Sequence, residues 1–381
     1  MNKREIFLAY GQQNIDDDDI AAVVETLKSP FLTTGPKIAE FEETVAAYVG
    51  AKYAVAFSNG TAALHAACFA AGIGKGDEVI TTPITFAASA NCVRYVGGDV
   101  VFADINAQTY NIDVIDIKRK ITPKTKALIP VDFTGQPADM DAIMELAKRH
   151  NLVVIEDGAH SLGAEYKGRK VGKLAHMTMF SFHPVKPVTT AEGGIIVTDN
   201  RHYYELLKLF RSHGIEQTAY AEEQGAWYYE MTSLGYNYRM TDLQAALGVS
   251  QMKKLGDFIE KRRKLAKLYN ELLCDIDGIT IPYQLENTQS GWHLYLIQLN
   301  EQSIGKTRKQ IFEGMRAANI GVHVHYIPVY WHPYYQQRGY QRGLCPVAEK
   351  WYEGTLTLPL HPSMTEQDIK EVVSLLLNQL Q

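Results

Sequence analysis

Lys186 is the residue of this chain whose surroundings best suit covalent chemistry. It lies in the segment SFHPVKPVTTAEGG, which contains Pro184, Pro187, a glycine pair and few charges. In such a rigid and poorly solvated turn a lysine amine has a lowered pKa, so it can act as a nucleophile. A lysine in a loop is more often a solvated charge, so the amine gains significance only together with other groups.

An acidic residue and a polar turn supply such groups. Asp157 ends the apolar run LVVIED (152–157), a position where ligands of open α/β sheets collect; capping of a following helix explains it equally well. The turn Ser58–Thr61 separates AVAF (54–57) from an alanine-rich helical stretch. Its Gly60 and Thr61 would offer backbone N–H groups to a phosphate at a helix N-terminus, although turns of this kind are common.

Together these residues match the needs of pyridoxal 5'-phosphate (PLP). PLP requires a lysine for its Schiff base, a carboxylate beside the pyridine nitrogen and a helix N-terminus for its phosphate. Phe86, in TTPITFAAS, could stack on the ring or belong to the core. Ser181, shortly before Lys186, could donate its hydroxyl to the phosphate. The combination predicts a PLP site.

The elements that must position this site read as an α/β fold. Short apolar runs rich in Val, Ile and Phe alternate with amphipathic stretches, which indicates a mostly parallel sheet covered by helices. The predicted strands are 54–57, 78–83, 99–105, 127–133, 152–157, 177–182 and 194–199. We expect one large domain over residues 1–250, including an N-terminal segment.

The pattern changes after residue 250. Residues 251–273 read as one long charged amphipathic helix that links two domains. Four further elements are predicted as strand, helix, strand and helix, at 293–299, 307–318, 321–329 and 366–379. They indicate a smaller α+β domain over residues 251–381.

Composition excludes several classes of function. The 381 residues carry a formal charge of −5, which argues against nucleic-acid binding. The uncharged stretch 53–74 is long enough to span a bilayer, but its polar centre favours a strand, turn and helix. The four cysteines form no C-x-x-C pair and no secretory signal opens the chain, so a cytoplasmic protein is expected.

Two other patterns were weighed as binding sites. The run GIGKGD (72–77) follows a helix and precedes a strand, the reverse of a dinucleotide-binding turn. His323 and His325 share one face of a predicted strand, with His332 nearby, but no third metal ligand has convincing spacing. We therefore expect no metal.

Seven segments resemble those of a known enzyme family. SNGTAAL, TTPITFAAS, VIEDGAHSLGA, SFHPVKPVTTAEGG, RSHG, GYNYRM and HLY follow one another as in the DegT/DnrJ/StrS-type sugar aminotransferases, which are fold-type-I PLP enzymes. The resemblance covers essentially the whole chain. Some relatives carry histidine in place of the lysine and perform dehydration; this chain keeps Lys186, which favours transamination.

The resemblance implies a role for each site residue. Lys186 would bind the cofactor covalently, Asp157 would pair with the ring nitrogen and His160 would lie beside the phenolic oxygen. The remaining cofactor contacts would be Phe86 on the ring and Gly60, Thr61, Ser181 and Asn237 on the phosphate. Asn237 would come from the neighbouring subunit of a homodimer.

The family resemblance also implies the substrates. The chain resembles in particular members that aminate C4 of a UDP-linked 4-keto-6-deoxy-N-acetyl sugar in pseudaminic acid biosynthesis, and the likeness implies L-glutamate as the donor. HVHYIP (323–328) resembles their nucleotide-side loop, whereas residues 30–33 match in position but partly differ in type. The substrate-binding residues expected from this likeness are Tyr10, Pro30, Phe31, Leu32, Thr33, His325 and Tyr326.

Three alternatives stay open at this point. The first is a related aminotransferase with another sugar or ring position. The second is a PLP-dependent lyase or desulfurase; the latter needs a mobile cysteine, and Cys68 and Cys92 lie in apolar surroundings that suit packing. The third is a non-catalytic PLP-binding regulator, for which the sequence shows no basic DNA-binding segment.

Overall fold

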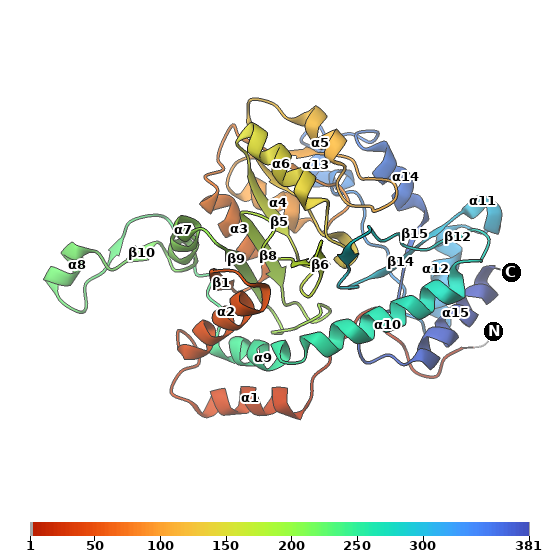
Figure 1. Ribbon diagram of the computed structural model, residues 1–381, viewed down its shortest axis with the longest axis horizontal. Coiled ribbons are helices and arrows are strands. Elements are labelled where there is room, and N and C mark those ends of the chain that lie inside the picture. The colour runs from red at the N-terminus through yellow and green to blue at the C-terminus, as the bar shows by residue number, and fades with distance from the viewer. Residues whose placement is uncertain (1–2, 381) are drawn as a thin grey trace.

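A large, mostly parallel sheet forms the centre of the protein in this computed structural model, which describes residues 3–380 (Figure 1). Strands β3, β2, β4, β5 and β8 run parallel, while β9 is antiparallel to both β8 and β1. The predicted α/β class is confirmed. In spatial order the strands are β1 (Tyr53–Phe57), β9 (Gly194–Thr198), β8 (Met177–Ser181), β5 (Val153–Asp157), β4 (Thr125–Ile129), β2 (Glu78–Thr81) and β3 (Asp99–Phe102).

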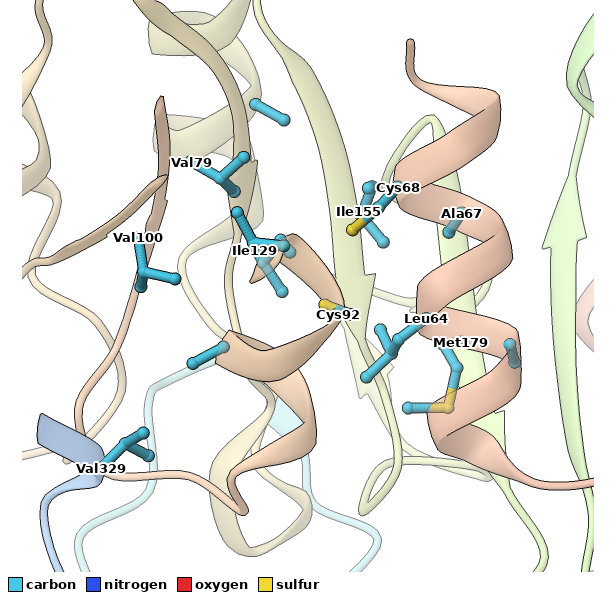
Figure 2. Packing of buried hydrophobic residues seen from close by; sticks show 14 of the residues in the cluster. Leu64, Ala67, Cys68, Val79, Cys92, Val100, Ile129, Ile155, Met179 and Val329 are labelled. Atoms are coloured by element: carbon cyan, nitrogen blue, oxygen red, sulfur yellow. The ribbon is translucent and has the colours of Figure 1, made fainter. Parts of the chain in front are cut away.

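Both faces of this sheet are buried, which explains the continuous apolar runs in the sequence. Val55 and Phe57 point into one core, whereas Ala54 and Ala56 point into the other. Figure 2 shows part of the first core, where Cys68 and Cys92 pack beside the strands. The helices on that side are α3 (Gly60–Ala70), α4 (Ala88–Tyr95) and α7 (Arg201–Arg211).

The opposite face of the sheet packs on a second set of helices, which are α2 (Pro36–Val49), α5 (Val114–Lys120), α6 (Met140–His150) and α9 (Asp242–Met252). Helix α1 (Asp17–Lys28) lies against α9 and is outside this layer (Figure 1). Asp16 caps α1 and forms a capping box with Asp19. The chain thus builds three layers, helices on sheet on helices.

The C-terminal part has a third core of its own. It packs the antiparallel strands β12 (Ile279–Thr280), β14 (Tyr295–Leu299) and β15 (Thr355–Leu358) against α10 (Leu255–Leu273), α12 (Arg308–Ala317) and α15 (Glu366–Leu380). Leu8, from the other end of the chain, also belongs to this core. The domain limits of 1–250 and 251–381 stay a prediction.

The remaining elements are short. A hairpin of β10 (Ile215–Glu216) and β11 (Glu230–Met231), with α8 (Ala219–Gln224) between them, extends away from the body (Figure 1). The others are β6 (Glu165–Tyr166), β7 (Arg169–Lys170), β13 (Thr288–Gln289), α11 (Glu301–Ile304), α13 (Pro333–Gln336) and α14 (Pro346–Gly354). Among the helices of residues 3–380, none combines the length and the apolarity that a membrane crossing requires.

Two predicted elements are wrong. The helix expected over 251–273 is broken, because α9 ends at Met252 and α10 begins at Leu255. At the break the Lys254 amine pairs with Asp16 and with Asp19, the latter at 3.0 Å, so contacts with α1 set the chain direction. The strand expected over 321–329 is absent there apart from one bridge, His323 to Thr357. After it the chain turns along a cavity, and Pro328 has no N–H for a ladder.

Candidate active site

A cavity of about 790 Å³ lies at the carboxyl ends of β5 and β8. It is lined by residues from the N-terminal segment, the sheet domain and the loop after residue 321. The predicted site residues that line it are Tyr10, Gly60, Thr61, Phe86, Asp157, His160, Ser181, Lys186, His325 and Tyr326. The fold therefore brings together residues that are more than three hundred positions apart in the sequence.

Two groups of predicted residues lie outside this cavity. Pro30, Phe31, Leu32 and Thr33 are exposed, and Thr33 forms a bridge with Thr241. Asn237 is also exposed and bridges Ser212 at the base of the protruding hairpin. Neither group lines the cavity of its own chain.

Lys186 is held at the floor of the cavity. Its backbone N–H donates to the carbonyl of His183, which tightens the turn that follows β8. Its Nζ lies 3.4 Å from Nε2 of His293. Burial lowers the pKa of Lys186 to about 8. The negative charge of Asp157 opposes this shift, and the positive charge of Arg262 adds to it. At pH 7 about a tenth of the amine is therefore unprotonated, far more than in an ordinary lysine, and the unprotonated form is the nucleophile.

Asp157 is fixed by short-range hydrogen bonds. Its Oδ2 accepts from the Ser89 hydroxyl at 2.6 Å and its Oδ1 from the Ala159 N–H at 3.1 Å. Ser89 is held in turn by the hydroxyl of Thr85 at 2.7 Å. Burial raises the pKa of Asp157, while the hydroxyl of Ser89 and the N–H of Ala159 lower it. A cationic ring nitrogen is the kind of partner that such a buried carboxylate lacks.

The N-terminus of α3 opens into the same cavity. Asn59 caps this helix by accepting the N–H of Ala62 at 2.8 Å. The first N–H groups of a helix, here those of Gly60 and Thr61, have no intrahelical acceptor. A Cβ at Gly60 would lie 3.3 Å from Met179 Sδ and 3.3 Å from Ser181 Cβ, so only glycine leaves this space open. The turn thus has the geometry of an anion cradle flanked by the Ser181 hydroxyl.

Imidazoles gather on the other side of the lysine. The rings of His160 and His293 are 4.4 Å apart, and Nε2 of His160 lies 3.4 Å from the Tyr326 hydroxyl. Burial lowers the pKa of both histidines well below the ordinary value, and the nearby Lys186 charge lowers it further. Nδ1 of each ring is buried without a protein partner in the described chain. Such atoms mark a surface made for a polar ligand.

Sequence reasoning does not single out three residues of this site. They are Ser89, which holds Asp157, His293, which contacts Lys186, and Tyr238, which lines the cavity. His293 begins the segment HLY and Tyr238 lies in GYNYRM, so family segments point to both without giving a role. Within residues 3–380 no cluster of three or more His, Cys, Asp or Glu side chains could hold a metal ion.

A half-buried lysine with a lowered pKa and a buried acid at neighbouring strand ends, beside an anion cradle, define a PLP enzyme of fold type I. The chain belongs to the DegT/DnrJ/EryC1/StrS aminotransferase family, whose model matches residues 13–377. It is therefore a PLP-dependent sugar aminotransferase.

Individual relatives agree with this assignment. The chain is 43% identical to the spore coat polysaccharide biosynthesis protein SpsC of Bacillus subtilis, over 98% of this chain and 97% of that protein. It is 39% identical to the UDP-4-amino-4,6-dideoxy-N-acetyl-beta-L-altrosamine transaminase of Campylobacter jejuni, over 96% and 95% of the two chains.

Solved structures extend the agreement to the fold and cofactor. Helicobacter pylori PseC, an aminotransferase of pseudaminic acid biosynthesis, superposes with a TM-score of 0.92 at 34% identity, over 98% and 99% of the chains. A putative sugar aminotransferase of Streptococcus pneumoniae in its PMP form superposes with a TM-score of 0.92 at 30% identity, over 98% of this chain and 99% of that chain. The PLP form of the same protein is also similar. The cofactor of the family is PLP.

Proposed function

We propose that this protein transfers the amino group of L-glutamate to C4 of a UDP-linked 4-keto-6-deoxy-N-acetyl sugar. The product would be UDP-4-amino-4,6-dideoxy-N-acetyl-β-L-altrosamine, as in the pseudaminic acid pathway. The observation that carries the chemistry is the pairing of an unusually acidic amine, Lys186, with a buried carboxylate, Asp157, in one cavity. The likeness to the Campylobacter enzyme supports the choice of sugar.

The cavity has a group for each part of the cofactor. When bound, PLP supplies a carbonyl carbon for amine exchange and a protonated ring that accepts electrons. Asp157 would hold the ring nitrogen and Phe86, which is 63% exposed at the cavity wall, would cover the ring. The phosphate would bind the N–H groups of Gly60 and Thr61 and the hydroxyl of Ser181.

The protein side chains also account for the proton transfers. The Lys186 amine would be free whenever it is not bound to the cofactor. Because burial lowers its pKa to about 8, it would be able to take up a proton and give it back near neutral pH. His160 stays neutral because burial lowers its pKa, so it can hydrogen-bond the phenolic oxygen without adding charge.

The outer part of the cavity is suited to the nucleotide sugar. The rings of His323 and His325 stack on each other at 4.5 Å, and Tyr10 packs beside both with centroid distances of 5.2 Å. Nδ1 of His325 hydrogen-bonds the Thr357 hydroxyl at 2.8 Å, which fixes its ring. We assign Tyr10, His325 and Tyr326 to substrate binding, because they line the same cavity as Lys186 and none of them is given a part in holding the cofactor.

The site needs a second copy of the chain to be complete. We infer a homodimer in which Asn237 reaches the phosphate of the neighbouring subunit and residues 30–33 contact its substrate. Helix α1 supports this inference, because it exposes Ile20, Val24 and Leu27 along one side. The protruding hairpin adds an exposed apolar surface that includes Trp227, Tyr229, Met231 and Leu234.

The test is an absorbance spectrum of the purified protein, followed by L-glutamate and a panel of UDP-keto-sugars. We expect a band of lysine-linked cofactor that disappears with L-glutamate and returns with one keto sugar. Return of the band with the 4-keto-6-deoxy-N-acetyl sugar supports the proposal. Absence of any band after PLP is added would remove Lys186 and Asp157 from their roles.

A different sugar or ring position is the second candidate. The observation that favours it is the 43% identity to SpsC, which exceeds the identity to the Campylobacter transaminase. The same panel decides, because only the true acceptor restores the band. We also infer a cytoplasmic location from the free thiols of Cys68, Cys92 and Cys345, which cell fractionation would check.

A further inference from the structure

His293 is the side chain closest to the reacting amine that the proposed chemistry leaves without a role. Its Nε2 lies 3.4 Å from Nζ of Lys186, and the residue is 4% exposed. It follows Trp292 in a loop that enters β14, far from Lys186 in sequence. The contact therefore joins the C-terminal core to the lysine of the sheet domain.

The backbone of this loop is fixed by a buried arginine. Nη1 of Arg262, on α10, donates to the carbonyls of Trp292 and His293 at 3.2 Å each and of Leu360 at 2.8 Å. Within residues 3–380 no carboxylate pairs with Arg262. Nε and Nη2 of Arg262 are buried without a protein partner in the described chain, so its side-chain hydrogen bonds all go to backbone carbonyls, and those of Trp292 and His293 tie the loop to α10.

We propose that His293 is a positioning residue for Lys186: its Nε2 accepts a hydrogen bond from the lysine amine whenever that amine is not bound to the cofactor. This inference rests on the proposed role of Lys186. The amine must leave the cofactor when the donor arrives and must then stay within reach of the reacting carbons. An acceptor at its present position would prevent it from adopting other rotamers.

The charges around the Lys186 amine favour a neutral His293 ring as its hydrogen-bond acceptor. Lys186 faces Asp157 on β5, Arg262 on α10, and the imidazoles of His160, His293 and His325. Burial and the neighbouring cations lower the pKa of His293 well below the ordinary value, so its ring does not compete for the proton. Donation by the amine to Nε2 requires that the single ring proton sits on Nδ1.

The test measures how the cofactor-free protein captures PLP at different pH values. The rate of appearance of the lysine-linked band follows the unprotonated amine, so its pH midpoint reports the proton affinity of Lys186. His293→Phe removes the acceptor and keeps the ring volume. His293→Gln keeps an acceptor, and His202→Phe, at an exposed site on α7, is the matched control.

We expect His293→Phe to lower the midpoint by about one pH unit, because the ammonium form loses a hydrogen bond. Capture at high pH should also slow about tenfold, because the amine is no longer held. His293→Gln and His202→Phe should keep the wild-type midpoint. If the Phe variant does not fold, His293→Asn, whose shorter amide does not reach Nζ, should give the same shift.

Two failures are distinguishable. An unchanged midpoint in both His293→Phe and His293→Asn, with folding confirmed by thermal melting, refutes the positioning role. A loss of amplitude at a constant midpoint indicates a purely structural residue and refutes it as well. Absence of a lysine-linked band in the wild-type protein contradicts instead the proposed role of Lys186.

Discussion

The inner and outer halves of this site are built in different ways. In the inner half, Asp157 is buried and hydrogen-bonded to Ser89, and the Lys186 amine contacts His293, so both reacting groups are held by neighbours of the same chain. The outer half includes Phe31 and Asn237, which are exposed and lie outside the cavity. The groups that act on the reacting atoms thus lie in one chain, and we propose that the second chain adds Asn237 at the cofactor phosphate and residues 30–33 at the sugar nucleotide.

This difference has a physical origin. An amine with a lowered pKa and a hydrogen-bonded carboxylate need burial, which the interior of an α/β sheet domain provides. A nucleotide sugar is large and must enter and leave, so its contacts lie where the surface can be exposed. Substitutions in the inner half should therefore lower kcat, and substitutions in the outer half should weaken the affinity for substrate.

The largest effect should follow from Lys186→Ala. We expect turnover to fall by at least about 10³-fold, because the variant loses both the covalent amine and the proton carrier. Lys173→Ala, which removes a surface lysine paired with Asp199, should leave turnover unchanged. Turnover and the absorbance spectrum are the measurements; steady turnover by Lys186→Ala would place the chemistry elsewhere.

Asp157→Asn should reduce turnover by about 10²–10³-fold, because the neutral amide cannot stabilise a protonated ring. The amide keeps the shape, and its oxygen can still accept from the Ser89 hydroxyl. KM for the sugar should change little, since Asp157 lies in the inner half. A KM increase with unchanged kcat would contradict this division of the site. Asp199→Asn is the control on the surface.

Asn237→Ala tests whether the outer half comes from the partner. We expect the loss of one phosphate contact to reduce activity about 10–100-fold. Mixing this variant with Lys186→Ala and allowing subunits to exchange should restore about a quarter of wild-type activity, because half of the dimers then contain one intact site. No recovery after verified exchange would mean that Asn237 acts in its own subunit.

Phe31→Ala should give a smaller change, a rise of about threefold to tenfold in KM for the UDP-sugar. The reaction with L-glutamate alone should keep its rate, because Phe31 is remote from Lys186 in the structure. Ile115→Ala, on exposed α5, is the matched control. Equal slowing of both half-reactions would assign Phe31 to the inner half instead.

The smallest effect concerns stability rather than activity. Asp132 and Glu156 are buried together behind the inner half, and burial raises the pKa of Asp132 to about 7 from 3.8 and that of Glu156 well above its usual value. The pKa of Asp132 is higher in the folded protein than in the unfolded chain, so the folded state favours the protonated carboxyl. The stabilisation from this protonation is complete below about pH 4. That contribution is lost as pH rises through about 7.

Glu156→Gln should weaken this pH dependence. The amide can donate to Asp132 without a shared proton, so the fall in Tm between pH 5 and pH 8 should shrink by a few degrees. Glu145→Gln, at an exposed site on α6, should leave that fall unchanged. The measurement is thermal melting across this pH range; an unchanged fall in Glu156→Gln would mean that the pair is not responsible.

Family segments and local chemistry were enough to predict much of the site. Lys186, Asp157 and the turn at Gly60 are each recognisable from neighbouring residues, because strand ends and helix starts leave local signals. The large sheet was predicted for the same reason, since runs buried on both faces are continuous in the sequence. The break in the helix at 251–273 was missed, because Lys254 turns the chain through contacts with Asp16 and Asp19.

By itself the sequence determined the cofactor class and the alternation of strands and helices, and it predicted the reacting groups. Only the tertiary structure decided which side chains meet those groups, as Ser89 does with Asp157 and His293 with Lys186. It also left Phe31 and Asn237 outside the cavity and changed the expected strand at 321–329 into a cavity wall. The reason is that such contacts join residues that are distant in the chain. Whether two such residues meet depends on how the cores pack, and this leaves no pattern in the local sequence.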